Sequence, residues 1–253
     1  MNAITTKGLT KRFGGVAAVD DLTFSVPQRA IYAIIGPNGA GKTTVINLLS
    51  GLYVPTSGEI TLLDRPVAGR SPEELARSGL SRTFQNIQVC MNMDALSNVM
   101  IGAHVHLDSG FVAGALRLPH IRRADADLKD RAAELMSFVG LSDQIKSRAS
   151  QMSYGGLKRL EIARALAADP KILLLDEPAA GLNHTETDAM SDLIAHIAAR
   201  GVTVVLVEHD MKLVMSVSHR ILVLNYGKKL AEGSPAEVRA DPEVIAAYLG
   251  VAA

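Results

Sequence analysis

Continuous apolar runs mark the strands that this chain buries. One run covers residues 31–35 and a second covers 172–175, and a third run, 202–207, is rich in β-branched residues and contains one threonine. Short runs of this kind, separated by longer segments with helical spacing, are typical of parallel strands that are buried on both faces. The pattern therefore predicts an α/β fold.

Shorter periodic patterns predict the remaining elements. Residues 22–26 alternate with period two and meet Pro27, which indicates a half-buried strand that ends in a turn. Ser71-Pro72-Glu73-Glu74 has the cap, the N1 proline and the N3 glutamate of a helix start. Further strands are expected at 59–63, 80–84 and in an edge hairpin of 221–224 with 228–231. Helices are expected at 42–50, 122–139, 184–200, 242–249 and directly after Ser153.

The turn between the first buried strand and its helix has the sequence of a phosphate-binding loop. This loop is Gly36-Pro37-Asn38-Gly39-Ala40-Gly41-Lys42-Thr43-Thr44. Its glycines let the backbone turn sharply and point N–H groups at a triphosphate, at the positive end of the next helix. We expect Lys42 to reach the β- and γ-phosphates and the Thr43 hydroxyl to ligate Mg²⁺. An ordinary glycine-rich loop is the weaker interpretation, because the pattern arises by chance in about one such chain in a hundred.

Polar side chains follow the other predicted strands. Asp176 and Glu177 come directly after a buried strand, where solubility explains paired acids poorly. We expect Asp176 to hold Mg²⁺ and Glu177 to orient and deprotonate an attacking water. Gln85 and His209 also stand at strand ends. A lone Gln or His is more often structural, but the carboxyl ends of parallel strands share one cleft.

Two further positions have a plain explanation beside the functional one. Phe13 lies on a glycine-flanked turn shortly before the loop, so its ring can stack on a base, although core packing is the commoner role of one aromatic side chain. Ser153 opens an amphipathic helix and can bind an anion with the N–H groups that follow it. Taken alone, a serine at this position is more often a simple N-cap.

Composition narrows the class of partner. The chain has 253 residues with 26 basic and 26 acidic side chains, so no basic excess points to nucleic acid. Cys90 is the only cysteine, which excludes an internal disulfide and fits a reducing compartment. No apolar run approaches 18 residues and the N-terminus lacks the apolar stretch of a signal peptide. We expect a soluble chain that reaches a membrane only through partners.

One long segment carries almost no charge. Between residues 83 and 107 the only formally charged side chain is Asp94, and the segment contains Met91, Met93 and Met100. Such a segment is either core of a helical subdomain or a surface that adapts to an apolar partner. We expect residues 86–107 to form part of a dock for a membrane subunit, with the core interpretation left open.

Together these motifs resemble, in order and spacing, the ATP-binding subunit of an ABC transporter, over essentially the whole chain. The resemblance implies a P-loop NTPase core of the RecA-like type, with an N-terminal antiparallel β portion and an inserted helical subdomain. We expect one ABC ATPase domain over 1–253, in which 1–85 and 166–253 bind nucleotide and 86–165 form the subdomain.

The resemblance also implies the role of each motif. Phe13 stacks on adenine, residues 36–44 hold the phosphates of ATP, and Gln85 contacts Mg²⁺ and water. Asp176 and Glu177 are then the Walker B pair, and His209 is the switch histidine on the γ-phosphate. The signature motif contains Ser153 and Gly155, and the D-loop is Ala180-Gly181-Leu182-Asn183.

Narrower motifs look like those of the branched-chain amino acid importer subfamily. They are Arg82-Thr83-Phe84-Gln85, Leu160-Glu161-Ile162-Ala163-Arg164, Asp176-Glu177-Pro178 with the D-loop, Glu208-His209-Asp210-Met211 and Ala247-Tyr248-Leu249-Gly250. The chain departs from the family at Gly156 and Leu157, since Gln is usual at the first of these positions.

The resemblance implies partners as well. Two ATPase chains, identical or paralogous, pair head to tail and sandwich two ATP, because Ser153 of one copy serves the loop of the other. Closing and opening of the pair then move permease subunits at the cytoplasmic face of the membrane, and a substrate-binding protein takes part indirectly. The alternative is a soluble ABC ATPase that acts on ribosomes or DNA, but tandem cassettes, a coiled coil and a basic stripe are all missing from the sequence. A GTPase would need N-K-x-D, and no Asn precedes Lys.

Overall fold

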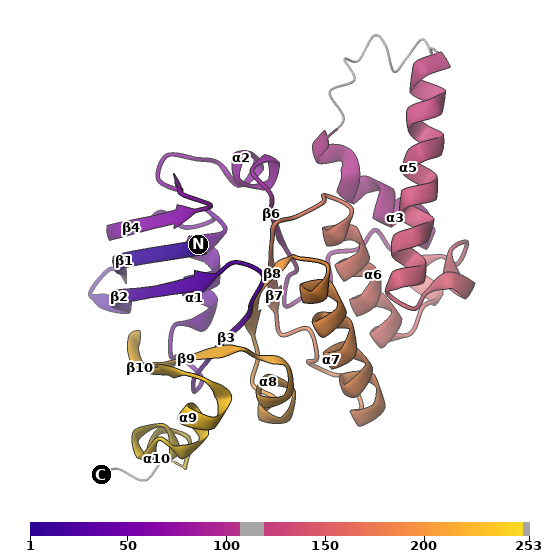
Figure 1. Cartoon of the computed structure of the whole chain (residues 1–253). Coiled ribbons are helices and arrows are strands. Elements are labelled where there is room, and N and C mark those ends of the chain that lie inside the picture. The colour runs from indigo at the N-terminus through magenta and orange to yellow at the C-terminus, as the bar shows by residue number, and fades with distance from the viewer. Residues whose placement is uncertain (107–118, 250–253) are drawn as a thin grey trace. The chain divides into compact units, whose positions relative to one another are not determined.

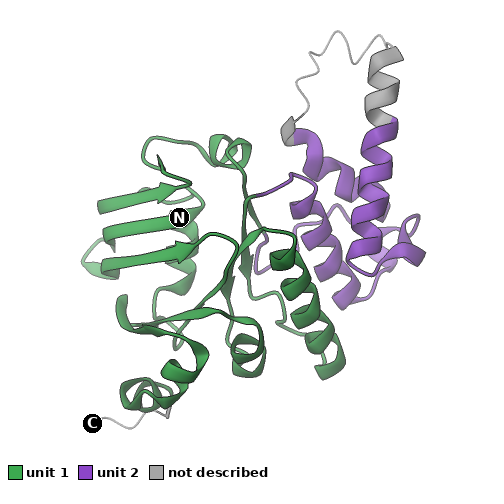
Figure 2. Ribbon diagram, in the orientation of Figure 1, with its two compact units in different colours: residues 1–82, 171–253 green, residues 83–170 purple. Residues whose placement is uncertain are grey.

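The computed structural model describes residues 1–106 and 119–249, and it divides into two compact units (Figure 2). Unit 1 contains Met1–Arg82 and Lys171–Ala253, and unit 2 contains Thr83–Pro170. The expected division, with boundaries after residues 85 and 165, differs from this one by a few residues at each boundary. Residues 107–118, which belong to the expected helical subdomain, lie outside the described part of the chain, as do 250–253.

A six-stranded sheet forms the centre of unit 1, in the order β10-β9-β3-β8-β7-β6 (Figure 1). Its strands are β3 (Ile31–Ile35), β6 (Leu80–Arg82), β7 (Ile172–Asp176), β8 (Thr203–Val207), β9 (Arg220–Asn225) and β10 (Lys228–Gly233). All neighbouring pairs are parallel except β9 with β10, which form the antiparallel edge hairpin. The carboxyl ends of β3, β7 and β8 therefore lie side by side.

Both faces of this sheet are buried, as the continuous apolar runs predict. On one face Tyr32 and Ile34 pack with the helix α1 (Lys42–Leu49). On the other face Ala33 and Ile35 pack with α8 (Met211–Val217), α9 (Pro235–Ala240) and α10 (Pro242–Leu249). Successive side chains of a strand point to opposite faces, so residues 32–35 of β3 alternate between the two cores.

A second, antiparallel sheet has the order β2-β1-β4-β5. Its strands are β1 (Asn2–Phe13), β2 (Val16–Pro27), β4 (Ser57–Leu62) and β5 (Arg65–Pro66). The sequence pattern predicts parts of β2 and β4 but not β1. The reason is visible in the pairing, because β1 changes register against β2 between Thr6 and Leu9, where Gly8 has a positive φ of 58°. That bulge interrupts the period-two pattern.

The other helices of unit 1 begin at well-formed caps. In α2 (Pro72–Arg77) the Ser71 hydroxyl accepts the Glu74 N–H, and the Glu74 carboxylate accepts the Ser71 N–H, as predicted. In α7 (His184–Ala199) Asn183 and Glu186 form the same reciprocal capping box. The short helices α8 and α9 were not predicted, since six or seven residues give little periodicity to read.

Unit 2 is helical. It contains α3 (Ala95–Gly102), α5 (Pro119–Phe138), α6 (Tyr154–Leu166) and the 3-10 turns Ala103–His106, Ser142–Gln144 and Ala149–Gln151. Gly102 lets α3 approach α6 closely, because a β-carbon there would overlap the Arg164 carbonyl. The low-charge segment is divided between core and surface: Ala95, Asn98 and Val99 are buried, whereas Met91 is 42% exposed. No helix among the described residues is both long enough and apolar enough to span a membrane.

Candidate nucleotide site

The predicted phosphate-binding loop connects β3 to α1, with Gly41 as the residue before the helix. Gly36 and Gly41 both have positive φ, at 153° and 101°, and a β-carbon on either would overlap a carbonyl, of Leu224 or of Ala18. Gly39 also has a positive φ, of 81°. Other residue types would be strained in this backbone, which turns sharply as the predicted phosphate-binding loop requires.

Lys42 is buried at the start of α1, and its ammonium is held by the loop itself. It donates to the carbonyls of Gly36 at 2.7 Å and Pro37 at 3.0 Å. Burial lowers the pKa of Lys42, and the carboxylates of Glu177 and Asp176 oppose this fall. The ammonium is therefore within electrostatic reach of both acids at the carboxyl end of β7, and the sheet brings the predicted loop and the predicted acid pair together.

Asp176 ends β7 and is buried, and a residue that we did not predict as part of the site holds it. The Arg82 guanidinium lies 3.0 Å from the Asp176 carboxylate and also donates to Asn47 at 2.6 Å and Ser50 at 2.9 Å. Burial lowers the pKa of Arg82, while its hydrogen bond to Asp176 and the charge of that carboxylate oppose the fall. Arg82 thus ties the carboxyl end of β7 to α1.

Glu177 and His209 stand at the ends of adjacent strands. Glu177 has a φ of 50°, and its N–H is bonded to the Val207 carbonyl of β8 at 2.9 Å. A positive φ in a non-glycine residue is uncommon and occurs often at functional sites. The Glu177 carboxylate lies 4.0 Å from Nδ1 of His209, whose ring is mostly exposed. The two predicted catalytic side chains of unit 1 are therefore neighbours.

Glu208 is a second side chain that the sequence did not single out for the site. It lies between Val207 and His209, is fully buried, and accepts backbone N–H groups from two loops. The signal was its position next to a candidate catalytic histidine, but a charged residue after a strand is ordinarily assumed to face solvent.

Phe13 ends β1 and is not a core residue, because 46% of it is exposed. Its ring makes an edge contact with Tyr53, with 5.4 Å between the ring centres, and the Lys11 ammonium lies 5.1 Å from the Phe13 ring. This arrangement leaves a flat aromatic group at the surface of unit 1, next to a cation.

Ser153 is the N-cap of α6, and its hydroxyl accepts the Gly156 N–H at 3.1 Å. Gly155 and Gly156 are buried. A β-carbon at Gly156 would approach the Ser153 hydroxyl to 3.2 Å, which is a tight contact. In this structure, therefore, the glycine that departs from the family pattern gives the cap room.

Gln85 lies in unit 2. The strand β6 ends at Arg82 and is shorter than the predicted 80–84, so Gln85 stands three residues beyond the strand end. Two buried charged side chains of α6 hold the backbone around it. Lys158 donates to the Gln85 carbonyl at 3.3 Å, and Glu161 accepts the N–H groups of Phe84 and Gln88, both at 3.3 Å. Burial raises the pKa of Glu161, and these two N–H donors oppose the rise.

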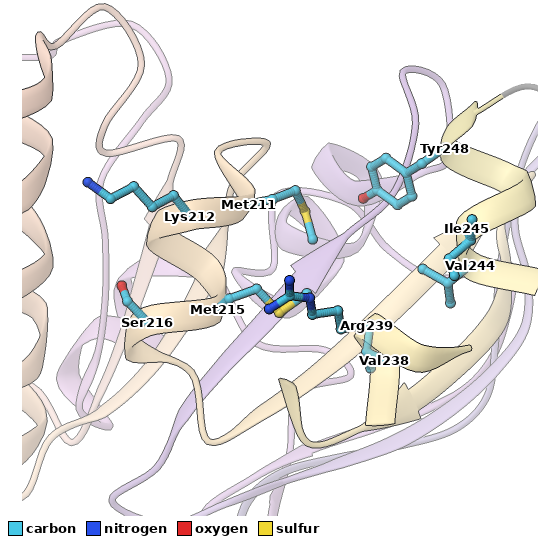
Figure 3. A pocket seen from close by; sticks show the side chains of 9 residues that line it. All are labelled: Met211, Lys212, Met215, Ser216, Val238, Arg239, Val244, Ile245 and Tyr248. Atoms are coloured by element: carbon cyan, nitrogen blue, oxygen red, sulfur yellow. The ribbon is translucent and has the colours of Figure 1, made fainter. Parts of the chain in front are cut away.

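One hollow of unit 1 is lined by none of the predicted site residues (Figure 3). It has a volume of about 710 Å³ and lies among α8, α9 and α10, with walls that are mostly apolar side chains. One wall is Tyr248. Burial raises the pKa of Tyr248 to about 12, and a hydrogen bond with the Gly36 backbone opposes the rise. The last described helix thus contacts the first residue of the phosphate-binding loop.

The donor set at the loop fits a magnesium ion bound together with phosphate. Thr43 is exposed at the start of α1, and Asp176 supplies a carboxylate at the end of β7. The described residues contain no group of three or more His, Cys, Asp or Glu side chains that can hold a metal by themselves. Mg²⁺ suits such a site, since it takes few protein ligands and completes its shell with phosphate and water.

Comparison with known proteins agrees with this geometry. The family described as ABC transporter matches residues 19–180, and the family described as branched-chain amino acid ATP-binding cassette transporter matches residues 228–253. The chain is 46% identical to the high-affinity branched-chain amino acid transport ATP-binding protein LivG of Salmonella typhimurium, over 98% of both chains. It is 45% identical to the corresponding protein BraF of Pseudomonas aeruginosa, again over 98% of both.

Solved structures share the fold. A nucleotide-free ATP-binding cassette from an ABC transporter superposes with a TM-score of 0.85 at 28% identity, over 98% of this chain and 99% of that one. A dimeric bacterial ABC transporter cassette has a TM-score of 0.78 at 25% identity, over 92% and 98%. The α/β P-loop fold expected from the sequence is confirmed, and the chain belongs to the ABC transporter family, among the ATP-binding subunits of branched-chain amino acid transporters.

Proposed function

We propose that this chain binds and hydrolyses ATP to power the import of branched-chain or other hydrophobic amino acids through partner membrane subunits. The single observation that carries the proposal is the meeting of three strand ends in unit 1. There the phosphate-binding loop, the acid pair and His209 follow β3, β7 and β8. The names of the relatives supply the class of transported solute. The alternative role on ribosomes or DNA finds no support among them.

In this proposal each residue has one task. The loop N–H groups and Lys42 bind the phosphates, and Phe13 stacks on the adenine. Glu177 orients the attacking water and takes a proton from it as the water oxygen bonds to the γ-phosphorus. The bond from that phosphorus to the β–γ bridging oxygen breaks, and ADP is the leaving group, while His209 contacts the γ-phosphate. Thr43, Asp176 and Gln85 hold Mg²⁺, which supplies charge neutralisation on the phosphate oxygens when it is bound.

In this proposal Asp176 binds both Arg82 and the magnesium ion or its water. Its carboxylate is paired with Arg82 at 3.0 Å, and a carboxylate has lone pairs for more than one partner. Arg82 therefore fixes the orientation of the carboxylate that would hold the ion or its water.

The proposed assembly is a head-to-tail pair, of two copies or of two related chains. Dimeric cassettes among the structural neighbours support pairing. Ser153 and Gly155 of one chain then serve the ATP bound to the loop of the other. Permease subunits at the cytoplasmic face of the membrane, with a substrate-binding protein acting on them, would complete the importer.

Replacement of the proposed base tests the chemistry. Glu177→Gln should keep ATP binding and lose about 10²- to 10⁴-fold in the rate of hydrolysis, which is the usual contribution of a general base. The measurement is phosphate release alongside nucleotide binding by the full chain. A Glu177→Gln variant that hydrolyses ATP like the parent would remove Glu177 from the proposed mechanism.

The low-charge segment 86–107, of which the side chains up to His104 are described, is the proposed dock for the permease. Met91 supports this role, because it is an exposed apolar side chain on a segment whose backbone begins next to Gln85. Met91→Glu should leave the melting temperature and ATP affinity unchanged and should abolish co-purification with the permease. Val99→Glu is the contrasting variant, since it buries a charge in unit 2 and should unfold it.

A further inference from the structure

The two carboxylate oxygens of Glu208 accept hydrogen bonds from two different loops. Its Oε1 accepts the N–H of Ala179 at 2.7 Å, in the turn that leads from Glu177 to residues 180–183. Its Oε2 accepts the N–H groups of His209 at 3.0 Å and Asp210 at 3.3 Å. The side chain is 0% exposed, so water does not compete for these bonds. Hydrogen bonds from N–H groups to a carboxylate are stronger than neutral ones.

The Glu208 side chain thus forms a bridge between the loops after β7 and β8, and backbone hydrogen bonds complete it as a closed ring of contacts. The Glu177 N–H donates to the Val207 carbonyl at 2.9 Å, and the Ala180 N–H donates to the Glu177 carbonyl at 3.2 Å. The loop after β7 is therefore bonded to the residue before Glu208 and to Glu208 itself. Within this ring the Glu177 carboxylate and His209 Nδ1 lie 4.0 Å apart.

We propose that Glu208 is a positioning residue that fixes His209 and Glu177 relative to each other, by bonding the loop after β7 to the loop after β8. The inference rests on the proposed function, since it assigns Glu208 to the same hydrolytic site. Glu208 does not touch the reacting atoms. It acts through the backbone on both sides of the pair, and through Ala179 it links His209 to residues 180–183.

Two variants separate the effect of the hydrogen-bonded bridge from the effect of the negative charge of Glu208. Oε2 lies 3.7 Å from His209 Nδ1, so a purely electrostatic effect on the imidazole is the competing explanation. Glu208→Gln removes the charge and leaves one acceptor oxygen, which serves only one of the two loops. Glu208→Asp keeps the charge but is one methylene shorter, so it also reaches only one loop.

The experiment measures kcat, the Kd for ATP and the melting temperature of the full chain isolated with its natural partner subunits. On the bridge explanation both variants lose about 10- to 100-fold in kcat, the effect of misplacing a catalytic group by about 1 Å. The Kd for ATP stays within about twofold of the parent in both. The matched control is Glu74→Gln, which changes a carboxylate that also accepts a backbone N–H but lies at the start of α2, and it should leave kcat unchanged.

Three results would overturn the bridge. In the first, both variants keep the parent kcat and only melt earlier, which is a purely structural role. In the second, Glu208→Asp behaves like the parent while Glu208→Gln is slow, which assigns the effect to charge. In the third, ATP affinity falls together with kcat. Glu177→Gln is measured in the same preparation, and retained hydrolysis there would overturn the proposed function itself rather than the bridge alone.

Discussion

Lys42 already has partners before any nucleotide binds. Its ammonium donates to two carbonyls of its own loop, and the carboxylates of Glu177 and Asp176 oppose the fall in its pKa that burial causes. In the proposed function, a phosphate in the loop would therefore meet a cation that these contacts already hold. Little side-chain entropy remains to be lost at that step.

Lys42→Ala should weaken ATP binding by about 1.5–3 kcal/mol, the usual contribution of a hydrogen bond to a charged group. This is a rise in Kd of roughly 10- to 150-fold. Equilibrium binding of a fluorescent ATP analogue measures it. Lys7→Ala, at an exposed position of β1, is the control and should bind like the parent. Equal affinity of Lys42→Ala and the parent would contradict the phosphate role.

Site residues whose hydrogen-bond partners lie far away in the sequence were not predicted, whereas those in a short local motif were. The loop and the acid pair follow from neighbouring residues, because a short motif and the strand before it contain the whole signal. The importance of Glu208 and Arg82 comes from partners 29 and 94 positions away. No local pattern indicates a contact of that kind, so both residues became visible only in the fold.

Among the elements, α6 is notable for two buried charged side chains. Lys158 and Glu161 are both buried on the helix and both contact the backbone of residues 84–88. Polar contacts of this kind fix the segment around Gln85 to the helix that Ser153 caps. A displacement of one therefore moves the other within unit 2.

Glu161 also makes the stability of unit 2 depend on pH. Its pKa is raised in the folded state, so folding is favoured below the unfolded value of about 4.3 and this contribution is lost as the pH rises through the raised value. Glu161→Gln keeps an acceptor oxygen for the Phe84 and Gln88 N–H groups and does not titrate. Its melting temperature should match the parent near pH 4 and exceed it at pH 7 to 8, by about 2–4 °C for each kcal/mol.

Thermal melts across that pH range make the comparison. Glu134→Gln, an exposed position on α5, should show no such divergence from the parent. A Glu161→Gln variant that is less stable than the parent at pH 8 would mean that the charge of Glu161 is needed, for example by Lys158.

Element prediction succeeded where burial imposes a pattern and failed where a bulge or a short length removes it. The strands β3, β7 and β8 have apolar side chains on both faces and were placed almost to the residue. By contrast β1 pairs through several register shifts, and α8 and α9 are barely two turns long. Tertiary packing, rather than local periodicity, fixes these elements.

For the molecule as a whole, the strongest expectation concerns pairing. With hydrolysis blocked, both nucleotides should remain between two chains, so Glu177→Gln should sediment as a dimer in saturating MgATP and as a monomer without it. The double variant Lys42→Ala with Glu177→Gln should stay monomeric, because it binds ATP poorly. If Glu177→Gln stays monomeric with MgATP, both alone and beside its natural partner subunit, the sandwich is wrong.

The contact of Tyr248 with Gly36 has a spectroscopic consequence. The chain contains five tyrosines and no tryptophan, so tyrosine emission is not hidden by a stronger fluorophore. Tyr248 shares a hydrogen bond with the loop that nucleotide must reshape or occupy. We expect ATP to change the intrinsic emission of the unlabelled protein, and Tyr248→Phe to remove part of that change. The remainder is expected from Tyr53, which contacts the Phe13 ring. The C-terminal helix would then serve as a built-in optical probe of the nucleotide site.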